Sequence, residues 1–112
     1  MSRQSNSSVD RRPSDPGLLI LTSLAGGPKH GHALLKDIES FAGVRLGPGT
    51  LYGAITRLEE QRLIEPLEAV DRRRPYRITA AGKAQLDAAV SSMRRITEVA
   101  SSRLGRTTRA FL

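Results

Sequence analysis

The chain has 112 residues, no cysteine and a formal net charge of +7 at neutral pH. The length is that of one small domain, which would gain stability from oligomerisation because its own core is modest. The absence of cysteine excludes disulfides, a thiolate metal site and a catalytic thiol. The positive charge favours a polyanion as the partner, but much of the excess lies in residues 80–112, so charge alone does not locate a binding site.

The N-terminal residues 1–14 are rich in Ser, Arg and Asn, which predicts a disordered arm. Such an arm is either a loose terminus or a minor-groove contact. Arg11-Arg12 ahead of the apolar run 18–21 resembles a twin-arginine export signal, but the run is short and lacks a clear cleavage site. No segment approaches the roughly 20 apolar residues of a membrane span. We therefore expect a soluble cytoplasmic protein that binds no membrane.

Two helices are predicted next. Asp15-Pro16 supplies an N-cap and a first-turn proline for a helix over residues 16–25, which the Gly-Gly-Pro sequence at 26–28 ends. A second helix is predicted over residues 31–42, with His30 capping or packing at its start. A short strand over residues 44–46 is expected to lead into the third helix.

The segment 46–63 carries the strongest functional signal. Gly47 suits the N-cap and Pro48 the first helical position. Two exposed helical glycines cost about 1 kcal/mol each relative to alanine; close approach of the backbone to DNA would explain them, and an amphipathic helix with a loose first turn is the alternative. The residues predicted to be buried are Leu51, Ala54, Ile55 and Leu58. The residues predicted to contact DNA are Gly49, Thr50, Tyr52, Gly53, Thr56 and Arg57.

A two-stranded β-ribbon is predicted after this helix, with strands over residues 63–70 and 75–79. Pro66 and Pro75 confine the strands to the edges or ends of a sheet. Arginines near the tip of such a wing would contact the DNA backbone or the minor groove, although a run of three arginines is also typical of a solvated turn. The residues predicted to contact DNA from the wing are Arg72, Arg73, Arg74 and Tyr76.

A long final helix, capped by Thr79, is predicted over residues 80–104. Its apolar residues recur in alternating steps of three and four, the spacing of a helix packed on another helix. A helix of about 25 residues spans roughly 37 Å, so we expect a symmetry mate to cover part of it; folding back over its own domain is the alternative. The residues predicted at a dimer interface are Leu18, Leu86, Ala89, Val90, Met93, Ile96, Ala100 and Leu104.

This order of elements predicts a mainly α (α+β) fold, a winged helix-turn-helix with a long C-terminal dimerisation helix. The expected organisation is a disordered arm over 1–14, a DNA-binding domain over 15–79, the dimerisation helix over 80–105 and a basic tail over 106–112. A dimer would place two recognition helices about one helical turn apart on DNA, which predicts a pseudo-palindromic operator.

The sequence offers little for catalysis or metal binding. His30 and His32 are the only histidines, and the nearby carboxylates are Asp37 and Glu39, which together make a poor metal site. There is no GxxxxGK phosphate loop, no GxSxG motif and no histidine–carboxylate–nucleophile trio. We therefore expect neither an enzyme nor a bound cofactor or metal.

These motifs together resemble the PadR family of transcriptional regulators, over roughly residues 16–105. The matching segments are GPKHG at 27–31, PGTLY at 48–52, RLE at 57–59, LI at 63–64, RRRPYRIT at 72–79 and AG at 81–82. The resemblance implies a homodimeric winged-helix repressor whose long helix forms the dimer, with Thr50, Tyr52 and Arg57 against DNA. The short C-terminal part is similar to the smaller PadR subfamily, which lacks the large C-terminal helical domain.

The resemblance also makes a small-molecule effector a candidate partner, because some members release DNA on binding small aromatic molecules. Such a pocket would lie between the first helix and the long helix, and without tryptophan an aromatic sandwich is not expected. Two alternatives to a DNA-binding repressor stay open. One is an adaptor that binds a protein and uses its basic surface for steering. The other is an RNA-binding winged helix, which the few aromatic residues do not favour because they form no stacking platform.

Overall fold

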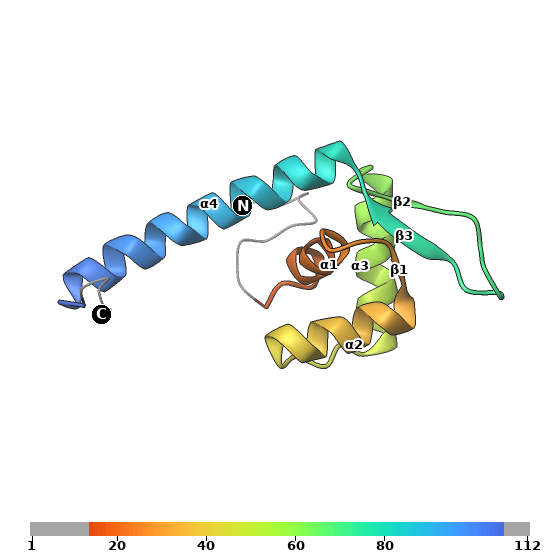
Figure 1. Ribbon diagram of the computed structural model, residues 1–112, viewed down its shortest axis with the longest axis horizontal. Helices are drawn as coiled ribbons and strands as arrows, with labels where there is room; N and C mark the ends of the chain where they lie inside the picture. Colours follow the sequence, from red (N-terminus) through yellow and green to blue (C-terminus); the bar gives the residue numbers. More distant parts are fainter. Residues whose placement is uncertain (1–13, 107–112) are drawn as a thin grey trace, which may run out of the picture.

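The computed structural model describes residues 14–106 as a cluster of helices beside a small sheet, from which one long helix projects (Figure 1). The result confirms the predicted mainly helical winged helix-turn-helix with a long C-terminal helix. The elements in chain order are α1 (Pro16–Leu24), β1 (Lys29–His30), α2 (Gly31–Ala42), α3 (Pro48–Glu60), β2 (Ile64–Pro66), β3 (Pro75–Ile78) and α4 (Ala80–Arg103).

The helices begin where the local sequence predicts. The side chains of Asp15, His30 and Thr79 cap α1, α2 and α4, each accepting a hydrogen bond from the backbone N–H three residues on, at 2.9, 3.4 and 3.0 Å. α3 begins with Gly47 in an extended conformation and Pro48 at the first helical position, without a side-chain cap. These caps satisfy backbone donors that the helix itself leaves unpaired.

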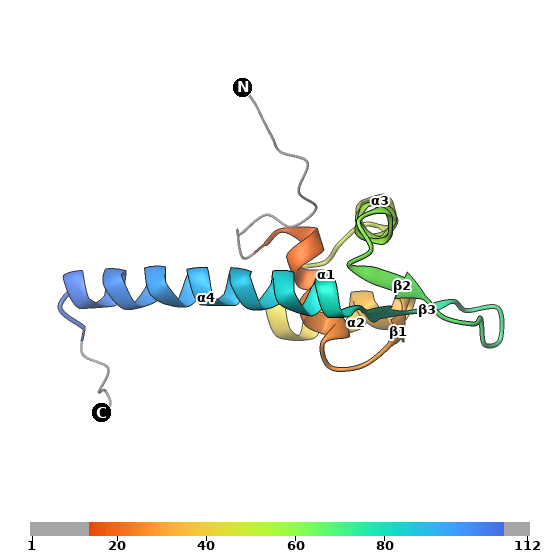
Figure 2. The same ribbon diagram turned by 90° about the horizontal axis from the view of Figure 1, so that it is seen from above.

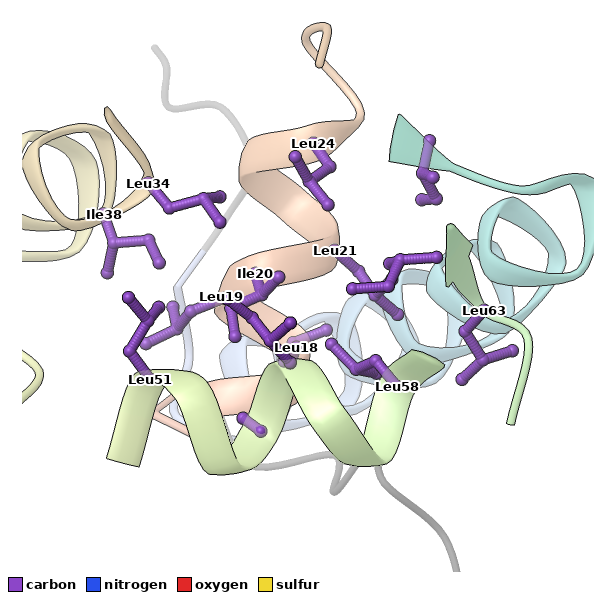
Figure 3. Packing of buried hydrophobic residues seen from close by; sticks show 14 of the residues in the cluster. Leu18, Leu19, Ile20, Leu21, Leu24, Leu34, Ile38, Leu51, Leu58 and Leu63 are labelled. Atoms are coloured by element: carbon purple, nitrogen blue, oxygen red, sulfur yellow. The ribbon is translucent and has the colours of Figure 1, made fainter. Parts of the chain in front are cut away.

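The core surrounds α1, which other elements cover on several sides (Figure 3). Its apolar residues from Leu18 to Leu21 are at most 3 % exposed. In Figure 3, Leu51 and Leu58 rise from α3 toward α1, while Leu34 and Ile38 of α2 lie at its side. The predicted buried stripe of α3 is confirmed, since its four residues are 0–2 % exposed. Full burial contributes about 1.5–3 kcal/mol for each large aliphatic side chain, so this stripe fixes α3 in its orientation.

The sheet corrects two of the sequence predictions. The predicted ribbon forms, because β2 pairs with β3, but a third strand joins it in the antiparallel order β1-β3-β2, so β3 is central and the sheet is not two-stranded. Residues 44–46 form no strand; the short strand lies instead at Lys29–His30, where Lys29 pairs with Tyr76. Pro75 is accommodated because it is the first residue of β3, where a missing backbone donor is tolerated.

α4 starts against the turn that joins α3 to β2. The backbone N–H of Thr79 donates to the carbonyl of Leu63 at 3.0 Å, and the Thr79 hydroxyl donates to the carbonyl of Arg62 at 2.7 Å. Gly82 is buried here, and a methyl group at this position would overlap the Leu63 carbonyl oxygen. These contacts set the direction in which α4 leaves the domain.

The two halves of α4 have different surroundings. Ala89 in the near half is buried, and Leu86 and Met93 pack partly against the core. Ile96 and Leu104 in the far half are 65 % and 69 % exposed. Both views show this half extending away from the rest of the domain (Figures 1 and 2). The alternative in which the helix folds back over its own domain is therefore wrong.

Candidate nucleic-acid interface

The outer face of α3 is the first part of the candidate interface. Because the apolar stripe of α3 points inward, the opposite face is left at the surface of the domain, and Figure 2 shows α3 end-on at the edge of the molecule. Of the residues predicted to contact DNA from this helix, Gly53 is half-buried and the others are exposed: Gly49, Thr50, Tyr52, Thr56 and Arg57.

The two glycines on this face are not required by packing within the domain. A methyl group at Gly49 would meet no atom within 4 Å, and one at Gly53 would come within 3.6 Å of Nη1 of Arg57 only. The helix therefore presents bare backbone at Gly49 and leaves room for the Arg57 side chain over Gly53. Such a surface allows another molecule to approach the helix axis closely.

Tyr52 is half-exposed and joins α3 to the start of α2. A methyl group at Gly31 would overlap the Tyr52 hydroxyl, which shows how closely the ring covers that glycine. The Thr56 hydroxyl donates to the Tyr52 carbonyl at 2.9 Å. With its proton used inside the helix, Thr56 offers oxygen lone pairs and a methyl group to a partner.

The wing tip is a two-residue turn that holds its arginines outward. Val70 and Arg73 exchange backbone hydrogen bonds of 2.8 and 2.9 Å, and the two residues between them, Asp71 and Arg72, have φ of 52° and 67°. Two positive φ angles define a type I′ turn, whose twist suits a hairpin. The Nη1 atom of Arg74 donates to the Leu67 carbonyl at 2.7 Å. All three predicted wing arginines are exposed.

The basic side chains near the interface fall into two groups, those with an ion pair and those without one. Arg45 pairs with Glu39 at 2.9 Å, and Arg77 pairs with Glu65 across the β2–β3 ladder. Within residues 14–106, no ion pair involves Arg57 or the wing arginines at 72–74. The cations next to the α3 face therefore keep their charge available to a partner.

Tyr76 is half-buried on β3, behind the wing arginines. Burial raises the pKa of its phenol, and the nearby Glu59 and Tyr52 raise it further, while Arg74 acts in the opposite direction. The side chain therefore stays a neutral hydrogen-bond donor well into the alkaline range.

The residues predicted at a dimer interface differ in exposure. Leu18 and Ala89 are buried within one chain, whereas Ile96, Ala100 and Leu104 are exposed. Sequence analysis missed two exposed apolar residues, Val99 on α4 and Phe41 at the end of α2. Val99 is not one of the apolar positions predicted for the interface. The helical period places Phe41 on the inner side of the helix over residues 31–42, yet it is 47 % exposed.

An apolar hollow of ≈ 350 Å³ lies where α1, the end of α2 and α4 meet. Its lining includes Leu18 and Thr22 from α1, Phe41 and Val44 from the α2 end, and Met93 from α4. The hollow coincides with the place where the family resemblance suggested an effector pocket, and Phe41 is its single aromatic residue.

In the described part of the chain, no three His, Asp or Glu side chains gather closely enough to hold a metal ion. None of the helices there is long and apolar enough to cross a membrane.

These features define a winged helix-turn-helix protein. Helix α3 has an apolar stripe that faces inward and a bare polar outer face, and the wing beside it carries arginines without ion pairs to the described residues. The chain belongs to the transcriptional regulator PadR-like family, whose sequence model matches residues 20–88. This is a family of transcriptional regulators rather than of enzymes.

Relatives of known sequence or structure agree with this assignment. A 37.1 kDa protein in a transposon of Streptomyces fradiae is 46% identical to this chain over 86 residues. These residues are 77% of this chain and 25% of that protein, so the chain spans about a quarter of its curated relative. A PadR family transcription regulator from Clostridium difficile is 26% identical with a TM-score of 0.71, covering 80% of this chain and 97% of that one. A transcriptional regulator from Clostridium thermocellum is 26% identical with a TM-score of 0.68, covering 78% and 87%.

Proposed function

We propose that the protein is a sequence-specific DNA-binding repressor that acts as a homodimer on a pseudo-palindromic operator. The observation that carries the proposal is the combination of the open α3 face and the unpaired arginines of the wing. The open face would enter the major groove, where Arg57 and Thr56 would contact base edges. The wing arginines would bind the flanking phosphates or the minor groove. A regulator of this kind would act in the cytoplasm, where the chromosome lies.

The far half of α4 supports the homodimer. Ile96, Val99 and Leu104 are exposed on it, and burying each would contribute about 1.5–3 kcal/mol. A second copy running alongside would cover them and place two α3 helices on one face of DNA. Leu86, Val90, Met93 and Ala100 would extend this interface, and the buried Leu18 and Ala89 would support it from beneath.

The hollow beside Phe41 supports regulation by a small molecule. Its ≈ 350 Å³ lies within the range of ligand sites, and its lining is mostly apolar. A second copy packed on α4 would border it, so an apolar effector there could change how the two copies, and hence the two α3 helices, are spaced. With one aromatic residue in the lining, we do not expect an aromatic sandwich.

The test is the affinity of the protein for the duplex upstream of its own gene, against a shuffled duplex, by fluorescence anisotropy. We expect a preference of roughly a thousandfold that weakens steeply with salt. Arg57→Ala and Tyr52→Ala should lose nearly all binding, whereas Tyr52→Phe keeps the ring over Gly31 and tests the hydroxyl alone. Folded Arg57→Ala and Tyr52→Ala variants that retain full affinity would refute the proposal.

The exposed apolar residues also favour one alternative, an adaptor that binds another protein through α4. In that case the protein would bind operator and shuffled duplexes equally, and the Ile96 face would be covered by a different chain. Co-purification of a partner at a fixed stoichiometry, together with absent operator preference, would support the adaptor over the repressor.

A further inference from the structure

A second hollow, which we call the wing hollow, lies between the wing and the start of α2. Its volume is ≈ 200 Å³. It is bounded by the first residues of α2, by one residue of α3, by β3 and by the wing tip. The lining residues are His30, Gly31, His32, Tyr52, Arg72, Arg73, Arg74 and Tyr76.

The lining of the wing hollow is entirely neutral or basic. No Asp or Glu lines it, and within residues 14–106 its arginines form no ion pair. Two acidic groups lie close by: Asp71 lines an adjoining hollow with His30, and Glu59 acts on Tyr76 from α3. Elsewhere on the domain, Arg45, Arg77 and Lys29 are matched by carboxylates. Three arginines without an ion pair thus line this one hollow.

The two histidines bring hydrogen-bond donors to this cationic site. Their rings are parallel within 9°, with centroids 6.5 Å apart. Nδ1 of His30 accepts the α2 cap hydrogen bond from Ala33, which leaves the ring proton on Nε2. The ring of His32 is exposed and makes no hydrogen bond to any of the residues 14–106. Both rings therefore have an N–H to offer without disturbing α2.

We propose that the wing hollow binds a DNA phosphate, held by His30 and His32 at the start of α2 and by the wing arginines. The inference rests on the proposed DNA-binding function and adds His30 and His32 to the DNA contacts assigned above. Tyr52 belongs both to this lining and to the exposed α3 face, so the hollow borders the surface that would meet DNA. If a duplex is bound on α3, the anion that lies closest to the hollow is therefore one of its backbone phosphates.

The identity of the donors predicts how binding depends on pH. Imidazole is the side chain whose charge changes between about pH 5 and 8, and a bound phosphate favours its charged form. The arginines keep their charge throughout this range. DNA affinity should consequently rise as the pH falls from 8 to 6, and His32 should account for that rise, because a second proton on His30 would displace its hydrogen bond from Ala33.

The experiment compares wild type, His32→Gln and the double variant His30→Asn/His32→Gln in duplex-binding anisotropy at pH 6 and pH 8. Asparagine is a good N-cap, so the double variant keeps α2 capped while removing both imidazoles. Lys36→Ala is the matched control, because Lys36 is an exposed cation of α2 that does not line the hollow.

We expect the double variant to bind operator and shuffled duplexes about tenfold more weakly at pH 6, with a smaller loss at pH 8. The slope of log affinity against log salt concentration should become shallower by the amount expected for about one phosphate contact. Lys36→Ala should keep the pH dependence of wild type. If the double variant keeps the affinity and pH profile of wild type while wild type binds its operator, the phosphate site is wrong and the proposed function stands.

Two further outcomes separate the possible sources of phosphate. Inorganic phosphate alone, titrated to millimolar concentration while the histidine ring signals are followed by NMR, should not saturate the site. Saturable binding of inorganic phosphate that excludes DNA would overturn the assignment to a DNA phosphate. A wild-type protein without any operator preference would instead contradict the proposed function itself.

Discussion

Helices α3 and α4 both bury one apolar face against α1, yet they leave opposite kinds of surface uncovered. The outer face of α3 carries glycine, threonine and arginine, whereas the far half of α4 exposes isoleucine, valine and leucine. A polar, cationic face is suited to a hydrated polyanion, and an apolar face is suited to another protein surface. In the proposed function, the two helices would therefore divide the contacts with DNA and with a second subunit between them.

The first turns of these helices show the same contrast in their glycines. Gly49 of α3 faces open space, while Gly82 of α4 lies directly against the carbonyl of Leu63. Gly49 leaves space for a molecule outside the domain, whereas Gly82 allows the backbone of the domain itself to pack closely. The following predictions test that division, beginning with the largest effect.

The apolar surface of α4 is tested by Ile96→Asp combined with Leu104→Asp. A charge buried without a partner costs several kcal/mol, so self-association should weaken by about a hundredfold or more. Sedimentation equilibrium measures the effect. Ser91→Asp, an exposed position on the opposite side of α4 from the predicted interface, should leave the dimer intact. A wild-type protein that stays monomeric at micromolar concentration would contradict the dimer.

Gly82→Ala tests the packed glycine. Its methyl group would overlap the Leu63 carbonyl, and overpacking of this kind costs about 1–3 kcal/mol, which urea unfolding would detect. Lys83→Ala, at the exposed neighbouring position, should change the free energy of unfolding by less than about 0.5 kcal/mol. Equal stability of the two variants would show that the start of α4 is looser than the structure indicates.

Gly49→Ala should have opposite effects on folding and on DNA binding. The methyl group meets nothing within the domain, so the free energy of unfolding should rise by about 1 kcal/mol. If DNA approaches this backbone, affinity for the operator should fall by about tenfold, because overlap with the duplex costs 1–3 kcal/mol. Unfolding and anisotropy measured on one preparation separate the two effects. Unchanged affinity would mean that DNA does not reach Gly49.

Tyr76→Phe should have the smallest effect, confined to alkaline pH. The raised pKa of Tyr76 means that its neutral form is favoured in the folded protein. Its contribution to stability is present below the ordinary tyrosine pKa of about 10 and is lost as the pH rises through the raised value. Urea midpoints should therefore fall less above pH 10 in Tyr76→Phe than in wild type. A parallel fall in both proteins would contradict this contribution.

Much of the fold follows from short stretches of sequence. The caps at Asp15, His30 and Thr79 and the proline at Pro48 fix where helices start, since a cap involves residues only three positions apart. The buried stripe of α3 follows equally from the helical period, and the turn residues placed the three arginines at an exposed wing tip. The predicted DNA-contacting and dimer residues stay predictions, since they concern molecules beyond one chain. Residues 1–13 of the arm predicted over 1–14, and residues 107–112 of the tail predicted over 106–112, lie outside the described residues.

Features that join distant segments were decided by the tertiary structure alone. The third strand formed at Lys29–His30 rather than at 44–46, because a strand exists only where a partner edge is available, and β3 offered that edge. Gly82 is required because it packs against the carbonyl of Leu63, which is distant in the sequence. The wing hollow forms only because α2, α3 and the wing meet. Local sequence determined the elements through contacts within a few residues, while their pairing required long-range packing.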